Sequence, residues 1–316
     1  MKSSLADLRA MKWVAGTILV IGVFCLAAVG CGMGSDVGDG GAISTTVTSA
    51  PEDTTTTVPA ETTTTLPSVT TSTSLAGDTT TLRVYFSRNE KMGAATRVIP
   101  KTQEVGAAAM RALLQGPTSD EKQAGLVSNI PEGTTFLGLD IENGVATVDL
   151  SKEYESGGGS LSMFMRLAEV VFTLTQFPSV EGVRFKLDGK PIEVLGGEGI
   201  IIDHPMSRLD FEDQSPAILV ESPTVLNTVR SPLRVTGTAN VFEATFRVQL
   251  IDSGGIEILD ELVTATSGTG TRGTFDVTLT YPADFEAGLG SLIVYFDSPK
   301  DGSKVVVDDI PVIFQK

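Results

Sequence analysis

The sequence of 316 residues has very few of the side chains that usually carry metal chemistry and nucleophilic catalysis. It contains two cysteines, Cys25 and Cys31, and a single histidine, His204. A zinc site of the Cys and His type cannot be assembled from this supply, and a His-containing catalytic triad could be built only around His204. Because both cysteines lie in or beside an N-terminal apolar run, no structural disulfide is available to the rest of the chain. We expect no enzyme activity and no cofactor.

Positive charge is also scarce, with 23 Lys and Arg residues against 39 Asp and Glu residues and a formal net charge of −16. A chain of this charge repels phosphate backbones, so we expect no nucleic-acid partner. Aromatic residues make up only 6%, but a hydrophobic content of 41% is sufficient for ordinary cores. The 33 glycines and 15 prolines indicate many turns.

The N-terminus has the order of a secretory signal. Lys2, Arg9 and Lys12 precede an apolar run over residues 14–30, and Cys31 follows. As a helix the run would span about 26 Å, less than the hydrocarbon core of roughly 30 Å. We therefore predict that residues 1–30 are removed.

The residues before Cys31, Ala28-Val29-Gly30, resemble the lipobox of bacterial lipoproteins. In that family a cysteine after a small residue receives diacylglycerol and becomes the new N-terminus. Cys25 follows Phe24 and does not fit, and the lipobox usually has Leu where this chain has Ala28. The resemblance implies lipid attachment at Cys31 and a location at the outer face of the cytoplasmic membrane. The alternative is an uncleaved signal anchor, which also leaves the remaining chain outside.

Residues 31–81 are predicted to form a disordered stalk. The part from 44 to 81 is almost entirely Thr, Ser, Pro, Val and Ala, with four acidic residues and no Lys or Arg. Such a composition cannot bury enough apolar surface to fold. The stalk is either O-glycosylated or a plain spacer.

Residues 82–198 are predicted to form an α+β two-layer domain with the order β-α-β-β-α-β-β. A strand at 82–86 precedes a helix that Thr102 can cap and that Gly116-Pro117 ends. Asn143-Gly144 predicts a hairpin in which Glu142 faces Val145, Ile141 faces Ala146, Leu139 faces Val148 and Leu137 faces Leu150.

A second helix is expected from Ser160, with one apolar stripe made by Leu161, Phe164, Met165, Ala168, Val171 and Phe172. A second hairpin at Asp188-Gly189 would pair Phe185 with Ile192 and Val183 with Val194. We expect both helices to pack on one side of the sheet, which is typical of an α+β fold.

This region resembles the GerMN domain, named for a spore germination protein and present in bacterial envelope lipoproteins. The resemblance rests on the order and spacing of residues 82–86 (LRVYF), 113–117 (LLQGP), 130–134 (IPEGT), 148–151 (VDLS) and 173–177 (TLTQF). It implies a link to sporulation, germination or wall-associated assemblies. GerMN domains in turn resemble ring-building modules, which implies homotypic or heterotypic protein contacts.

Residues 217–316 are predicted to form an all-β immunoglobulin-like sandwich. Seven candidate strands recur at 218–221, 233–238, 244–251, 256–264, 274–281, 291–296 and 305–314. The core is expected to use Phe246, Phe275, Tyr281, Tyr295 and Phe296. The part resembles the immunoglobulin-like spore germination module Gmad2, on the residues 222–223 (SP), 231–232 (SP), 235–239 (VTGTA), 241–244 (VFEA) and 301–303 (DGS).

An acidic connector, residues 199–216, holds the remaining candidates for chemistry. His204 beside Asp203 could act as an oriented base, but no nucleophile motif accompanies it, and a solvated loop histidine is favoured. Asp203, Asp210, Glu212 and Asp213 could bind a divalent cation, but they lack EF-hand spacing, and a solvated linker is favoured.

The glycine-rich loop at 157–160 lacks the lysine of a phosphate-binding loop and is interpreted as a flexible loop. Asp188-Gly189-Lys190 and Asp301-Gly302-Ser303 are interpreted as turns.

We therefore expect a non-catalytic envelope lipoprotein that acts as an interaction or scaffold module, with the membrane and envelope proteins as partners and homotypic assembly as an open alternative. No metal or catalytic residues are assigned. A lipoprotein that binds a solute or wall fragment is the alternative, and a hydrolase is a further one that requires a pocket with convergent titratable groups.

Overall fold

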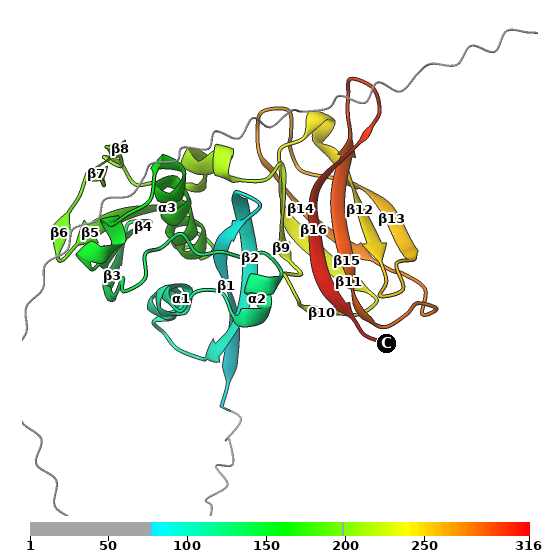
Figure 1. Cartoon of the computed structure of the whole chain (residues 1–316), viewed down its shortest axis with the longest axis horizontal. Helices are drawn as coiled ribbons and strands as arrows, with labels where there is room; N and C mark the ends of the chain where they lie inside the picture. Colours follow the sequence, from blue (N-terminus) through cyan, green and yellow to red (C-terminus); the bar gives the residue numbers. More distant parts are fainter. Residues whose placement is uncertain (1–76, 198) are drawn as a thin grey trace, which may run out of the picture. The chain divides into compact units, whose positions relative to one another are not determined.

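The computed structural model describes residues 77–197 and 199–316, which belong to one compact unit (Figure 1). An α+β region comes first and an all-β region follows, so the predicted fold class is confirmed. Within these residues, no helix has the length and apolar character needed to cross a membrane. The predicted signal segment and the stalk up to residue 76 lie outside the described residues. The predicted end of the stalk at residue 81 is wrong, because Thr79 to Thr81 already belong to a β-strand.

The first two strands form a long hairpin of their own. Strand β1 (Thr79–Arg88) pairs antiparallel with β2 (Lys91–Pro100) through the turn Asn89-Glu90, where both residues have positive φ. The prediction contained β1 but not β2. The turn lacks the usual glycine, and the first five residues of β2, from Lys91 to Ala95, carry no β-branched side chain.

Two helices follow the hairpin, α1 (Val105–Leu114) and the short α2 (Ser119–Gln123). The prediction that Thr102 caps α1 is wrong, because the N-cap residue is Glu104 and the Thr102 hydroxyl instead accepts a hydrogen bond from the Glu104 backbone N–H at 3.1 Å. Helix α2, which was not predicted, begins with a capping box between Thr118 and Glu121.

A four-stranded sheet carries the predicted hairpin, in the strand order β3 (Phe136–Glu142), β4 (Val145–Leu150), β5 (Gly182–Leu187) and β6 (Lys190–Pro191). Three predicted pairs are confirmed, namely Glu142 with Val145, Ile141 with Ala146 and Leu139 with Val148. The pair Leu137 with Leu150 is wrong. The register shifts between Phe136 and Gly138, so that Phe136 faces Leu150 and Leu137 is 51% exposed.

The second predicted hairpin is right near its turn and wrong further out. The Ile192 backbone N–H donates to the Phe185 carbonyl at 3.1 Å, as expected. Val183 pairs with Met206 and not with Val194. Val194 belongs to a separate two-stranded sheet of β7 (Val194–Leu195) and β8 (Ile200–Ile201).

Helix α3 (Ser160–Leu174) is the central helix of the first region and begins at the predicted residue. It contacts β1, α1 and β5 (Figure 1). Almost every residue from Met163 to Leu174 is buried. The predicted apolar stripe is present, except that Leu161 is 50% exposed. A short 3₁₀ helix, η1 (Lys152–Glu155), packs Tyr154 against this core.

The second region is a sandwich of two sheets joined to the first region through η2 (Arg208–Gln214). One sheet has the order β14 (Gly273–Leu279), β11 (Leu233–Ala239), β9 (Ile218–Ser222). The other has the order β10 (Thr228–Val229), β16 (Lys304–Phe314), β15 (Gly288–Asp297), β12 (Thr245–Ile251), β13 (Glu257–Thr264). A single turn, η3 (Phe242–Ala244), leads into β12.

All seven predicted strands of the second region are present, and β10 is additional. Four of the five predicted core aromatics are buried, while Phe296 is partly buried. Phe246 and Phe275, from opposite sheets, meet edge to face with ring centroids 4.9 Å apart.

Candidate functional site

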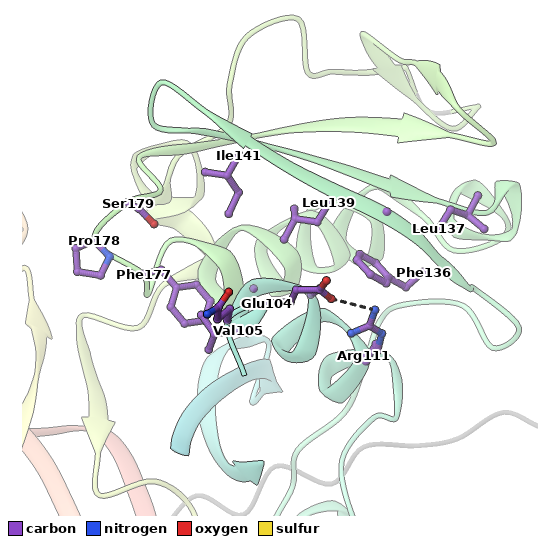
Figure 2. Close-up of a pocket in the computed structure, with 14 residues that line it drawn as sticks. Glu104, Val105, Arg111, Phe136, Leu137, Leu139, Ile141, Phe177, Pro178 and Ser179 are labelled. Carbon is purple, nitrogen blue, oxygen red and sulfur yellow. Dashed lines mark ion pairs between the residues drawn. The ribbon is translucent and has the colours of Figure 1, made fainter. Parts of the chain in front are cut away.

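A groove of about 710 Å³ runs between the start of helix α1 and strand β3 (Figure 2). Leu139 and Ile141 point from β3 toward the helix, and Phe177 and Pro178 lie at one end. Volumes of this size are typical of ligand and peptide sites.

Glycine sets the depth of the groove. A Cβ atom on Gly106, in the first turn of α1, would lie 2.9 Å from Leu139 Cδ2, so any larger residue here would displace the Leu139 side chain or move the helix away from the strand. The bulge at Leu137 then turns that side chain outward, where it lines the groove but stays half exposed.

An ion pair borders the groove. Arg111 Nη2 lies 4.0 Å from Glu104 Oε2, and the guanidinium also stacks on the Phe136 ring at 5.3 Å from its centroid (Figure 2). Both charged side chains are more than half exposed, so the pair contributes little to stability. Its effect is to neutralise the one arginine at the groove.

Strand β3 is the terminal strand of its sheet, and one of its edges faces away from β4. Two hydrogen bonds at the end of β4 show which way its peptide groups face. The Leu150 carbonyl accepts from the Asp188 N–H and so faces β5, whereas the Ser151 N–H donates to the Thr135 carbonyl on the β3 side. The peptide groups of a strand alternate in direction, so those of Gly138 and Asp140 face β4. The N–H and C=O of Leu139 and Ile141 therefore face outward.

Two acidic side chains stand on this edge strand. Asp140 and Glu142 are exposed on β3. Within residues 77–197 and 199–316, neither carboxylate forms an ion pair. The free edge of β3 is therefore apolar toward the groove and negative beside it.

Sequence reasoning missed a buried polar cluster on α3. Glu169 is fully buried and accepts hydrogen bonds from the Asn129 backbone N–H at 2.7 Å, the Asn129 side chain at 3.0 Å and the Ser128 hydroxyl at 3.0 Å. Burial raises the pKa of Glu169 to about 7, against these hydrogen bonds. The cluster fixes the loop after α2 to the central helix, and no groove residue belongs to it.

Arg166, one turn before Glu169, is 2% exposed and holds the start of the glycine-rich loop in place. Its guanidinium donates to the carbonyls of Tyr154, Ser156 and Gly157 at 2.6, 3.1 and 2.9 Å. The carbonyls of this loop are therefore satisfied by a cation, which differs from a phosphate cradle, where N–H groups converge on an anion. Asp188-Gly189 and Asp301-Gly302 are turns with positive φ at glycine, as predicted.

His204 lies between two carboxylates and is half exposed. Its Nδ1 is 3.0 Å from Asp203 Oδ1 and its Nε2 is 3.1 Å from Asp210 Oδ1, and these hydrogen bonds raise the pKa of His204. Asp210 in turn accepts from the Ser207 backbone N–H at 2.7 Å. The histidine thus helps to cap η2.

The acidic connector is a solvated linker only in part. Asp203 and Asp213 are exposed, but Glu212 accepts from Arg272 at 2.8 and 3.0 Å and from Asn240 at 2.8 Å. In the described part of the chain, no group of three or more His, Cys, Asp and Glu side chains could hold a metal ion. Cys31, the predicted lipid attachment site, lies outside the described residues.

In the described residues, an α+β region precedes an immunoglobulin-like sandwich. Residues 83–193 match the family described as sporulation and spore germination, and residues 217–303 match the family described as immunoglobulin-like domain of bacterial spore germination. The chain therefore carries a GerMN domain followed by a Gmad2 domain.

Similar proteins point to the same domain. The spore germination protein GerM of Bacillus subtilis strain 168 is 28% identical over 138 residues, which is 43% of this chain and 37% of that protein. The match thus spans little more than a third of the relative's length.

Two solved structures are also similar to this chain. The tandem GerMN domains of the B. subtilis sporulation protein GerM have 20% identity and a TM-score of 0.38, covering 64% of this chain and 62% of that one. The first GerMN domain of the same protein has 26% identity and a TM-score of 0.37, covering 42% and 99%.

Proposed function

We propose that this protein is a non-catalytic interaction module of the bacterial cell envelope, held at the outer face of the cytoplasmic membrane by lipid on Cys31. Its role is to scaffold an assembly linked to sporulation, germination or the cell wall. The observation that carries the proposal is the presence of the GerMN and Gmad2 domains in one chain, because both family descriptions name sporulation or germination and neither names a reaction. The apolar groove beside an open strand edge supports a binding role.

The lipid tether is tested by replacing Cys31. In cells fed a radiolabelled fatty acid, Cys31→Ala should abolish labelling of the protein and move it out of the membrane fraction, because two acyl chains supply the stable anchor. Cys25→Ala is the matched control and should behave as the natural chain. Unchanged membrane retention of Cys31→Ala would favour the uncleaved signal anchor.

The interaction role is tested by crosslinking in growing and sporulating cells followed by mass spectrometry. The proposal expects envelope proteins to be recovered with this chain in at least one of the two states. Recovery of nothing above the background of a deletion strain, in both states, would rule the role out.

A binding protein for a solute or wall fragment is the second candidate, favoured by the groove volume of about 710 Å³. The charged pair at the groove is Glu104 and Arg111, which bind each other and leave few polar groups to orient a solute. A thermal-shift screen with wall fragments and small solutes separates the candidates, since a saturable rise in Tm would support the solute role.

A further inference from the structure

We propose that the open edge of β3 binds an extended segment of a partner protein in which apolar side chains alternate with Lys or Arg. The segment would add to the sheet as a further strand and place its apolar side chains in the groove over α1. The inference rests on the proposed interaction role and specifies the surface and the chemistry of the partner.

The backbone of β3 offers the hydrogen bonds. Leu139 and Ile141 direct their N–H and C=O groups to the free edge, and the bulge at Leu137 limits pairing to residues 138–142. Unpaired edge strands are templates for another strand, and proteins usually protect them with charged side chains, above all lysine, with proline, with a bulge or with a covering element. β3 contains neither lysine nor proline, and its bulge lies before residues 138–142, whose pairing with β4 is regular.

The side chains of β3 define what the inward face of the segment must be. Leu139 and Ile141 direct their side chains into the groove, so the residues of an added strand that lie directly opposite them would face the groove as well. Ile141 is 40% exposed and Leu137 is 51% exposed, which leaves apolar surface for the segment to cover. Apolar side chains at alternate positions fit this face.

Charge defines the opposite face of the segment. Asp140 and Glu142 alternate with Leu139 and Ile141, so they would lie beside the outward residues of the added strand. These two carboxylates make the edge negative, and opposite charges across adjacent strands are favourable. The same charge argues against a second copy of this chain, because two acidic edges would repel each other.

The test uses the full-length chain in lipid nanodiscs and a fluorescein-labelled peptide of the sequence KVKVKVK, with binding followed by anisotropy. Saturable binding is expected. The peptide KKKKVVV has the same composition without alternation, and EVEVEVE has the opposite charge. Both should bind about tenfold or more weakly, since one or two rim charges and a matched apolar face account for about that factor.

N-methylated peptides separate strand addition from electrostatic attraction to an acidic protein. Methylation of one alternate set of backbone nitrogens removes the donors that face β3 and should abolish binding, whereas methylation of the other set should be tolerated. In an antiparallel addition the sensitive set belongs to the valines. Equal binding of both methylated peptides would overturn the proposal.

Charge reversal on the protein side locates the surface. The double variant Asp140→Lys, Glu142→Lys should lose KVKVKVK and gain EVEVEVE. The matched control reverses two exposed acids of the second domain, Glu261→Lys and Asp284→Lys, and should leave both affinities within about twofold, because screened charges far from the site contribute little.

Two further results would contradict the proposal at this surface, namely no saturable binding of KVKVKVK or an equal loss of binding in the control variant. Either result would leave the interaction role standing if crosslinking in cells still recovered envelope proteins. The failure of the role and the failure of this surface are therefore distinguishable.

Discussion

At the scale of single residues, Glu169 shows how a buried charge escapes sequence reasoning. The interval of three residues between Arg166 and Glu169 resembles an exposed pair on a helix surface. Both side chains are instead buried, because α3 is covered by β1, α1 and β5 together. The apolar stripe of the helix was predictable from its period, but the burial of its polar side depends on elements distant in the sequence.

The titration of Glu169 predicts a specific dependence of stability on pH. Its pKa is raised from 4.5 to about 7 in the folded chain, so the folded state holds its proton more tightly than the unfolded state does. The stabilising contribution of the protonated group is complete below about pH 4.5 and is lost as pH rises through about 7. The free energy of unfolding should therefore fall over this range by on the order of 3 kcal/mol.

Denaturant unfolding at a series of pH values measures this effect. The variant Glu169→Gln should lack the fall, whereas Glu132→Gln, an exposed residue of the same loop, should keep it. If the free energy of unfolding of the natural chain and of Glu169→Gln changed in parallel between pH 5 and 8, the raised pKa of Glu169 would be disproved.

At the scale of elements, the groove depends on how closely α1 approaches β3. Most of the β3–β4 hairpin followed from Asn143-Gly144 and from alternation, which set three of its pairs correctly. The bulge at Leu137 carries no local signal, because the residue continues the apolar alternation. From the sequence, Gly106 looks like an ordinary residue of low helix propensity, although a side chain at this position would meet Leu139 on β3.

A larger side chain at position 106 should therefore lower the stability of the fold and change the shape of the groove. In Gly106→Val the new side chain meets Leu139 and Ile141, and the free energy of unfolding should fall by about 1 to 3 kcal/mol despite the better helix propensity of valine. Denaturant unfolding measures the loss.

Ala108→Val is the matched control on the same helix, at a partly exposed position outside the groove, and should lose less than about 1 kcal/mol. If the two variants were equally stable, the close packing of α1 on β3 would not hold.

At the scale of the whole molecule, the connector is a structured joint. Arg208 donates to Glu221 on β9 at 2.7 Å and to the Tyr85 hydroxyl on β1 at 3.2 Å, and Tyr85 also donates to Glu221. Burial disfavours the Glu221 carboxylate, yet the charge of Arg208 and these hydrogen bonds keep its pKa below the ordinary value. The order of the two regions was predictable from residue patterns, but this joint was not. Its contacts join distant parts of the sequence, since Tyr85 and Arg208 are more than 100 residues apart.

The central claim is that this chain works by binding an envelope partner through the edge of β3. The most direct measurement places a photo-crosslinking amino acid at Leu137 in cells, with Leu262 on β13 as a control of similar exposure, 51% against 58%. The account predicts a crosslink from position 137 to a protein segment with alternating apolar and basic side chains, and no such product from position 262. No product above background from position 137 in growing and sporulating cells, or the same product from both positions, would contradict it.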